Sequence, residues 1–406
     1  MNISLRKYPY PYQAMLALCS DLDETPNKDI YFETARYLNT TEQTLLGKGV
    51  GLEVGNTIYF DMPENQFSYT NTDQDGREKI HHLIDSGHID CLHSFGDFVN
   101  SRERIKQCWA DLQKGPRKIE VWIDHAQAPT NLDDGIMQGK GAVVGGNAFH
   151  TDLTIKPGGL HFIWKGRVTS IASQNVKRSY RSLFNVREPY KSGKTILIEF
   201  VKGWFARLGS VKYAMHKDNR VLRKTQLVDG TPVQEFMRCN PSWGGVSVFD
   251  SARGIHNVLT ELVLNTLVEN EGCSVLYSHL GKVFSVEQAF QKKTQDAFEL
   301  LAAYQENRLI LTATTRRLLG YCRSFEELSF IVKSVGDEVQ IHLSSAYNGQ
   351  DLYGLTWYAD DPEKVSLYIN GEYYANLQTN PADNSGRKSV SIAWLPLVFP
   401  DIKSQL

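Results

Sequence analysis

The sequence predicts an α/β fold in which a β/α barrel is followed by a small all-β sandwich domain. Apolar strand-like runs alternate with helix-like runs from the start of the chain to about residue 320. The pattern loosens between about residues 145 and 245, and the periodicity changes to two after about residue 325. We therefore expect a barrel over residues 1–322, with inserted hairpins and loops at about 145–245, and a β-sandwich domain over residues 323–406.

The expected barrel strands are apolar runs bounded by polar residues or turn signals. Helices are expected where apolar residues recur at helical spacing, over residues 100–113, capped by Asn100 or Ser101, and over residues 286–306. Alternation of strands with helices over this length favours a barrel over an open sheet. The expected strands are residues 15–20, 51–60, 90–93, 119–123, 142–144, 195–200, 274–277 and 309–313.

The C-terminal region has the alternation that is typical of half-buried strands. Val339, Ile341 and Leu343 fall on one face of the first such run, residues 338–343. Turn signals such as Asn370-Gly371 separate it from later runs of similar length. Several short strands in sequence predict a small β-sandwich. The later runs are residues 355–359, 365–369, 373–377 and 389–394.

Composition excludes several classes of protein. The formal net charge of −2 and the absence of a basic cluster argue against a nucleic-acid partner. No apolar segment is long enough to span a membrane, and no signal peptide is expected. The six cysteines are scattered singly, without a Cys-x-x-Cys pattern, so we expect a reducing, cytoplasmic setting. The oligomeric state is left open.

Two carboxylates follow the first barrel strand. Asp21 and Asp23 come directly after the apolar run 14–19, and residues two apart in a strand point to the same side. Two neighbouring carboxylates repel unless one is protonated, bonded to a base or neutralised by a cation. A divalent metal is the simplest solution, with one carboxylate as a general base and the other as a metal ligand. Capping aspartates in a turn are the structural alternative.

A second strand end carries a histidine and an aspartate. His93 and Asp97 are four residues apart, so both would share a face if Ser94 began a helical turn. Imidazole nitrogen and carboxylate oxygen suit zinc and several other divalent ions. The two strand ends together predict a hydrolytic metal centre.

These motifs resemble those of the polysaccharide deacetylase superfamily, the NodB-like barrels. Ser20-Asp21-Leu22-Asp23-Glu24 is similar to that family's first motif, which implies Asp21 as catalytic base and Asp23 as metal ligand. His93-Ser94-Phe95-Gly96-Asp97 is similar to its second, His-Ser/Thr-x-x-His, motif, with Asp97 in place of the second histidine. His279, at a later strand end, matches the family's general acid. The resemblance implies a distorted (β/α)7-type barrel, a zinc cofactor and N-deacetylation of an acetamido sugar in polysaccharide or glycan metabolism.

Further residues are candidates for substrate binding. His125 and Asn131 follow the expected strand 119–123, and His150 lies in a later polar loop. Arg238 is suited to orienting a carboxylate, and an indole ring can stack on a sugar. The candidates are His125, Asn131, His150, Trp204, Arg238 and Trp243.

Three alternatives to a deacetylase stay open. Asp21-Leu22-Asp23-Glu24-Thr25 also resembles the Asp-x-Asp-x-Thr run of haloacid dehalogenase phosphatases, in which Asp21 would be a nucleophile and the metal magnesium. A glycoside hydrolase on the same barrel would use two carboxylates. A non-catalytic carbohydrate-binding protein is the third alternative, because Asp97 departs from the family's motif.

Overall fold

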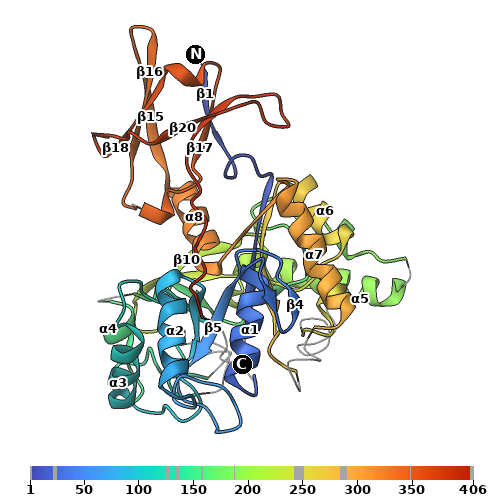
Figure 1. Cartoon of the computed structure of the whole chain (residues 1–406), viewed down its shortest axis with the longest axis vertical. Coiled ribbons are helices and arrows are strands. Elements are labelled where there is room, and N and C mark those ends of the chain that lie inside the picture. Colours follow the sequence, from blue (N-terminus) through green and yellow to red (C-terminus); the bar gives the residue numbers. More distant parts are fainter. Residues whose placement is uncertain are drawn as a thin grey trace.

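The computed structural model describes residues 2–21, 25–123, 128–132, 138–156, 159–186, 188–241, 251–283, 290–347 and 349–402. These residues form a mixed α/β body below a pair of small sheets (Figure 1). The predicted barrel is present as a closed barrel of seven parallel strands. Its strands, in spatial order, are β2 (Ala14–Ser20), β5 (Gly55–Tyr59), β6 (Ile89–Ser94), β7 (Val121–Ile123), β8 (Phe162–Trp164), the β11–β12 segment (Pro232–Phe236 and Arg238–Cys239) and β13 (Cys273–Ser278).

One interrupted strand closes the barrel. β11 and β12 are separated only by Met237, and they pair with different neighbours. β11 pairs with β8 through Gln234 and Glu235, whereas β12 pairs with β13 through Cys239. The two ends of the sheet path therefore meet in one extended segment. Additional strands lie at the margins of the barrel: β9 (Val168–Thr169), β10 (Leu222–Gln226) and β14 (Ile310–Ala313).

Alternation along the barrel strands separates an inner and an outer core. Along β2, Leu16 and Leu18 pack into the cluster that includes the surrounding helices, while Met15, Ala17 and Cys19 belong to the cluster inside the barrel. Side chains two apart in a strand point the same way, so a polar residue two positions beyond an inner apolar residue also points inward. The helices of this layer are α1 (Lys28–Asn39), α2 (Gln74–Ser86), α3 (Arg102–Leu112), α6 (Glu261–Glu269) and α7 (Lys292–Glu306).

Several expected elements differ in the structure. The helix expected over residues 100–113 is α3, and Ser101 caps it by accepting a hydrogen bond from the backbone N–H of Arg104. Residues 142–144, expected as a strand, form turns. Residues 195–200, also expected as a strand, lie inside helix α5 (Pro189–Arg207). The β-branched and aromatic residues of that run have strand propensity, but the helix buries only its small and polar side.

The region 145–245 is more than an insertion of hairpins and loops. It contains the barrel strands β8, β11 and β12 as well as helix α5. β8 and β12 span only three and two residues, and strands this short leave little periodic signal in the sequence. The other small elements here are α4 (Thr151–Thr154) and the 3-10 helices at Arg181–Leu183 and Val211–His216 (η2).

Two four-stranded sheets follow the barrel. One contains β15 (Ser329–Val335), β16 (Glu338–Ser344), β18 (Val365–Ile369) and β19 (Glu372–Tyr373). The other contains β17 (Thr356–Ala359), β20 (Leu377–Asn380), β21 (Ser389–Ile392) and, unexpectedly, β1 (Ile3–Arg6) from the opposite end of the sequence. The small hairpin of β3 (Gln43–Thr44) and β4 (Gly47–Lys48) lies beside the barrel.

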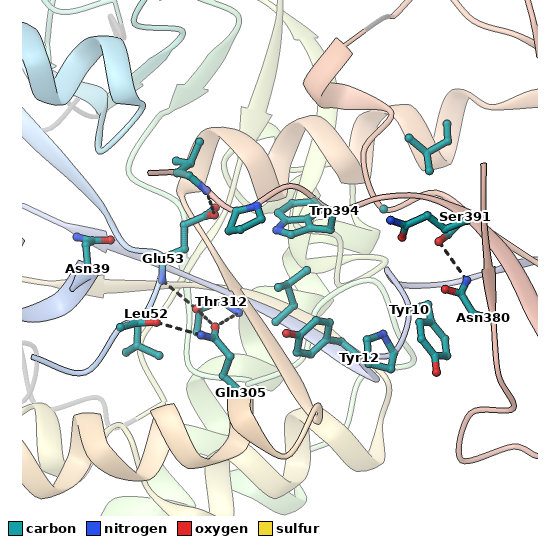
Figure 2. Close-up of a pocket in the computed structure, with 18 of the residues that line it drawn as sticks. Tyr10, Tyr12, Asn39, Leu52, Glu53, Gln305, Thr312, Asn380, Ser391 and Trp394 are labelled. Carbon is teal, nitrogen blue, oxygen red and sulfur yellow. Dashed lines mark hydrogen bonds between the residues drawn. The ribbon is translucent and has the colours of Figure 1, made fainter. Parts of the chain in front are cut away.

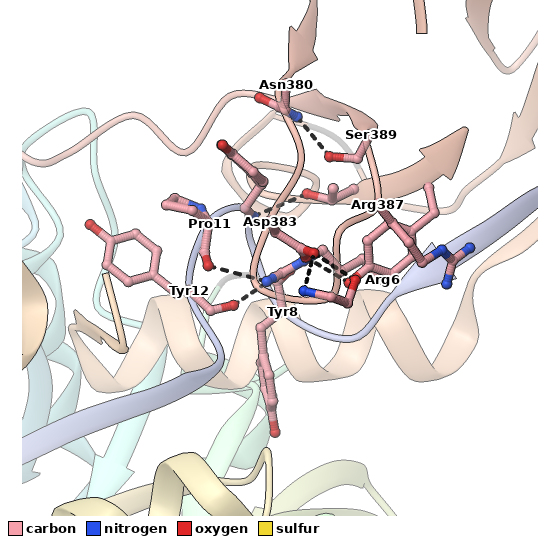
Figure 3. Close-up of polar contacts among 12 residues, drawn as sticks. Arg6, Tyr8, Pro11, Tyr12, Asn380, Asp383, Arg387 and Ser389 are labelled. Carbon is pink, nitrogen blue, oxygen red and sulfur yellow. Dashed lines mark hydrogen bonds and ion pairs between the residues drawn. The ribbon is translucent and has the colours of Figure 1, made fainter. Parts of the chain in front are cut away.

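Each end of the chain packs on the part of the molecule formed by the other end. β1 pairs antiparallel with β17, so residues 3–6 belong to the C-terminal sheet rather than to the barrel. Arg6 holds the following turn by donating to the carbonyl groups of Tyr8, Pro9, Pro11 and Tyr12 (Figure 3). At the other end, the backbone N–H of Leu397 donates to Glu53 of the barrel, and Ile402 is buried in the outer core.

Helix α8 (Thr315–Glu327) lies between the barrel and the C-terminal sheets (Figure 1). The expected domain boundary at residue 322 falls inside this helix. Its arginines reach both parts: Arg316 pairs with Glu120 of the barrel region and with Asp351 of the C-terminal region, to which Arg323 also donates. Charge-assisted hydrogen bonds from α8 therefore connect it to both parts of the molecule.

Candidate functional site

A polar cluster lies inside the barrel at the C-terminal ends of its strands. Asp21 directly follows β2, His279 directly follows β13, His93 lies near the end of β6, and Arg238 begins β12. Each of these four side chains is fully buried. Asp21 and His93 lie two residues beyond the inner residues Cys19 and Cys91, which explains why both point inward.

Asp21 and Arg238 form the centre of this cluster. Nη1 of Arg238 donates to Oδ2 of Asp21 at 2.9 Å, and Nη2 donates to Oδ1 at 2.5 Å. Nη2 also donates to the sulfur of Cys19 at 2.8 Å. This two-point geometry is the strongest form of an arginine–carboxylate pair. The two residues are 217 positions apart in the sequence, and only the closure of the barrel brings them together.

Two aromatic rings enclose the guanidinium group of Arg238. Its central carbon lies 4.4 Å from the ring centroid of Trp164 and 4.3 Å from that of Tyr277. Because aromatic faces attract a cation, the rings favour the charged guanidinium group in a site without water contact. Trp164 and Tyr277 are inner residues of β8 and β13, and both were missed as site residues by the sequence analysis. The alternation along β8 and β13 turns both rings to the inner side of the barrel, where Arg238 lies, and this alternation is the feature that could have identified them.

The histidines complete the cluster. Nε2 of His93 lies 3.5 Å from Oδ2 of Asp21 and 3.3 Å from the hydroxyl of Tyr59, another residue that sequence reasoning missed. Nε2 of His279 lies 3.0 Å from the hydroxyl of Tyr277. Backbone pairing places His279 beside Asp21, since the N–H of Asp21 donates to the carbonyl of Ser278 at 2.8 Å.

Asp21 is ionised in this environment. Burial by itself would raise the pKa of the carboxyl group, because a charge is costly away from water. The positive charge of Arg238 and the hydrogen bonds from Arg238 and His93 outweigh burial, so the pKa of Asp21 is well below its usual range. The carboxylate is therefore a permanent negative charge that accepts hydrogen bonds.

The expected metal ligands are only partly brought together. His93 is buried beside Asp21, but Asp97 is exposed. The helical turn expected at Ser94 is wrong: Ser94 ends strand β6, and Gly96 in a left-handed conformation (φ +102°) turns the chain away. Asp23 lies outside the described residues. Within the described part of the chain, no three His, Cys, Asp or Glu side chains gather closely enough to hold a metal ion.

The expected substrate-binding residues lie in different parts of the structure. His125 and Trp243 lie outside the described residues. His150 is fully buried outside the barrel wall, 5.6 Å from the ring of Trp122, where it contacts the carbonyl oxygen of Thr130. Burial lowers the pKa of His150 to about 4, so its imidazole is neutral at pH 7.

The remaining two candidates also lie apart from the central cluster. Asn131 is completely buried, and its side chain has no hydrogen-bond partner among the described residues. Trp204 is 52% exposed on helix α5, where it packs against Phe205 rather than against the barrel interior. Of the six candidates, Arg238 alone contacts Asp21 in the described part of the chain, and it does so by binding a carboxylate.

A cavity lies away from this cluster, at the opposite ends of the barrel strands. It has a volume of about 370 Å³ and lies between the barrel and the C-terminal sheet (Figure 2). Its polar side chains already bond to neighbours: Gln305 accepts from the backbone N–H of Thr312, and Asn380 donates to Ser391. Because the barrel centre has the ionised carboxylate and two histidines, it is the stronger candidate for chemistry.

Comparison with known proteins identifies no relative: no family model, no curated protein and no solved structure matches this chain.

Proposed function

We propose that this protein is a hydrolase that removes the acetyl group from an N-acetylated sugar of a polysaccharide or glycan. The observation that carries the proposal is the ionised Asp21, held by Arg238 and His93 at the C-terminal ends of the strands of a closed parallel barrel. Catalytic residues of parallel barrels lie at this end because side chains from several strands converge there. The motifs around Asp21 and His93 supply the resemblance to carbohydrate deacetylases.

In this proposal Asp21 accepts a proton from the attacking water. A carboxylate with a strongly lowered pKa is a weak base, so its proton donor must be more acidic than free water. A divalent metal, zinc in this proposal, would supply that acidity and polarise the acetyl carbonyl group. His93 and Asp23 would hold this metal. Asp97 is not retained as a ligand, because it is exposed while His93 is buried.

His279 is the proposed proton donor to the departing amine. It directly follows β13, which pairs with β2, so His279 and Asp21 lie at neighbouring strand ends. In the reaction, water adds to the carbonyl carbon as Asp21 takes its proton. The carbon–nitrogen bond then breaks as His279 protonates the nitrogen, yielding acetate and the free amine.

The same geometry weighs against the phosphatase alternative. That reaction needs one carboxylate oxygen of Asp21 as a nucleophile, whereas Arg238 donates to both oxygens. The double contact lowers both the nucleophilicity and the basicity of the carboxylate, but proton transfer needs only a free lone pair, whereas phosphoryl transfer needs an oxygen that is free to form a covalent bond. We therefore place deacetylation first.

Acetate release tests this proposal. The full chain is incubated with zinc and a panel of N-acetylated hexosamine oligomers and polymers. Asp21→Asn keeps the shape and removes the base, so we expect turnover to fall by about 10³-fold. Asp97→Asn is the matched control, with activity within about twofold of the unaltered protein because the side chain is exposed. Full activity in Asp21→Asn, or no acetate from any member of the panel, would contradict the proposal.

A further inference from the structure

Helix α5 has its large apolar side chains on the outside. The residues that it buries are small or polar: Ser192, Thr195, Glu199, Gly203 and Ala206. Its large apolar side chains face solvent instead, which is the reverse of a helix that packs on a globular core. The exposed fractions of these side chains are 87% for Tyr190, 61% for Leu197, 57% for Phe200, 37% for Val201, 52% for Trp204 and 41% for Phe205.

The exposed apolar surface continues on both sides of the helix. Phe184 and Val186 precede α5, and Leu208 and Val211 follow it, each more than half exposed. Of the 21 exposed large hydrophobic residues in the described part of the chain, ten lie between residues 184 and 211. Singly scattered apolar residues are normal on a protein surface, but such a concentration marks an interaction site. We call residues 184–186 and 188–213 the α5 surface.

The outward orientation of the helix is firmly held. Buried Glu199 accepts hydrogen bonds from the hydroxyl of Thr169 and the backbone N–H of Ser170, each at 3.0 Å, and from Lys202 at 2.7 Å. Burial by itself would raise the pKa of Glu199, but His216 and Lys202 outweigh it and lower the pKa to about 2. An ionised carboxylate so bound fixes which face of α5 turns to the barrel, and hence which face is exposed.

The charges around the apolar face are mostly positive. Residues 188–212 contain five basic residues and two acidic ones, and Lys202 is bonded to the buried Glu199. Four basic residues and Glu188 remain around the exposed face. The whole chain, by contrast, carries a net charge of −2. A second copy of the chain would bring the same positive charges against this face, which disfavours a symmetric dimer. The basic residues are Lys191, Lys194, Lys202, Arg207 and Lys212.

We propose that the α5 surface binds an anionic phospholipid membrane, with the helix lying in the plane of the headgroups. Trp, Phe and Leu on one face, flanked by lysine and arginine, are the composition that such interfacial helices share. No helix in the described residues is both long and apolar enough to cross a bilayer, and binding along the surface needs none. Figure 1 shows α5 at the edge of the molecule.

The α5 surface adjoins the barrel mouth. A pocket of about 510 Å³ lies between the start of α5 and helix α6, and Lys191, Leu262 and Pro241 contribute to its lining. Pro241 is three residues beyond Arg238 of the central cluster. Membrane binding through α5 would therefore hold the mouth of the barrel near the lipid headgroups. The inference does not depend on which reaction the barrel catalyses.

Vesicle flotation with the full chain tests the proposal. Vesicles of phosphatidylcholine alone are compared with vesicles that contain about 30% phosphatidylglycerol. We expect binding to the anionic vesicles, weakened by salt, and affinity for the neutral vesicles lower by about tenfold or more. Equal binding to both kinds of vesicle, or none to either, would overturn the proposal.

Matched variants identify the surface responsible. Leu197→Gln with Trp204→Gln removes two exposed side chains without touching the core, and we expect binding to fall about tenfold or more. Ile331→Gln with Val335→Gln is the control, because these residues of β15 are similarly exposed, at 57% and 51%. Equal loss in both variants would contradict the assignment to α5. A dimer in light scattering that only the first variant dissociates would assign the face to a second copy instead.

Discussion

Two buried arginine–aspartate pairs in this molecule differ in the groups that surround them. Arg238 and Asp21 meet inside the barrel, while Arg6 and Asp383 meet where the N-terminal segment joins the C-terminal sheets (Figure 3). The other N–H groups of Arg6 donate to four backbone carbonyl groups, so Arg6 stabilises the turn at residues 8–12. Asp383 in turn accepts hydrogen bonds from the hydroxyl groups of Tyr358 and Ser385.

The partners of Arg238 are different. Beyond Asp21, it contacts the sulfur of Cys19 and two aromatic rings, and histidines lie on the adjoining strands. Carbonyl partners lock a chain segment, whereas ionisable partners allow protons to move. The comparison teaches that arginine–aspartate pairing alone does not mark a site, and that the titratable groups around the pair do.

Removal of each arginine gives the largest expected effects. Arg238→Met leaves Asp21 as an uncompensated buried charge, so we expect the free energy of unfolding to fall by about 3–5 kcal/mol. Arg6→Met should cost less, about 2–3 kcal/mol, because Asp383 keeps its other hydrogen bonds. Equilibrium urea denaturation measures both values. Adding Asp21→Asn to Arg238→Met should recover part of the loss, and a larger loss for Arg6→Met would reverse the comparison.

Acid titration sharpens the comparison. Burial would raise the pKa of Asp383, but hydrogen bonds from Ser385, Arg6 and Tyr358 lower it to about 2. Because the folded-state pKa lies below the unfolded value near 3.9, its contribution to stability is present above about pH 4 and is lost as the pH falls through 2. Asp383→Asn should therefore be less stable than the unaltered protein at pH 7, by about 1–2 kcal/mol, and the difference should shrink progressively as the pH falls from 4 through 2. Thermal unfolding across this range tests it. A difference at pH 2 as large as that at pH 7 would contradict the assignment.

Two tyrosine substitutions give the smallest and most discriminating effects. Tyr277→Phe removes the hydroxyl beside His279 but keeps the ring over Arg238, so we expect turnover to fall about tenfold, with a shifted pH profile and little loss of stability. Tyr358→Phe removes a hydrogen bond to Asp383 at 2.8 Å. It should lower stability by about 1 kcal/mol and leave turnover unchanged. If both variants changed activity alike, the distinction between the two pairs would fail.

Much of the inner register could be predicted from the sequence. One apolar strand ends at Asp21, and a second ends near His93. Because the C-terminal ends of parallel strands lie at the same end of a barrel, these two polar side chains are expected to lie close together. The suitability of Arg238 for binding a carboxylate follows from its chemistry. The exposure of Asp97 does not follow, since it depends on how Gly96 turns the chain after β6.

By itself, the sequence determined which residues share a face along β2, β6 and β13, because the period of two is a local property of a strand. It did not determine which face is inward, because every residue of these three strands is buried. Only the tertiary structure decided that Arg238 meets Asp21, that β1 pairs with β17, and that the apolar run 195–200 is a helix with its large side chains facing out. Each of these depends on contacts between segments distant in the sequence. Such contacts override local propensity, because the free energy of burying and pairing charges exceeds the small preferences of single residues.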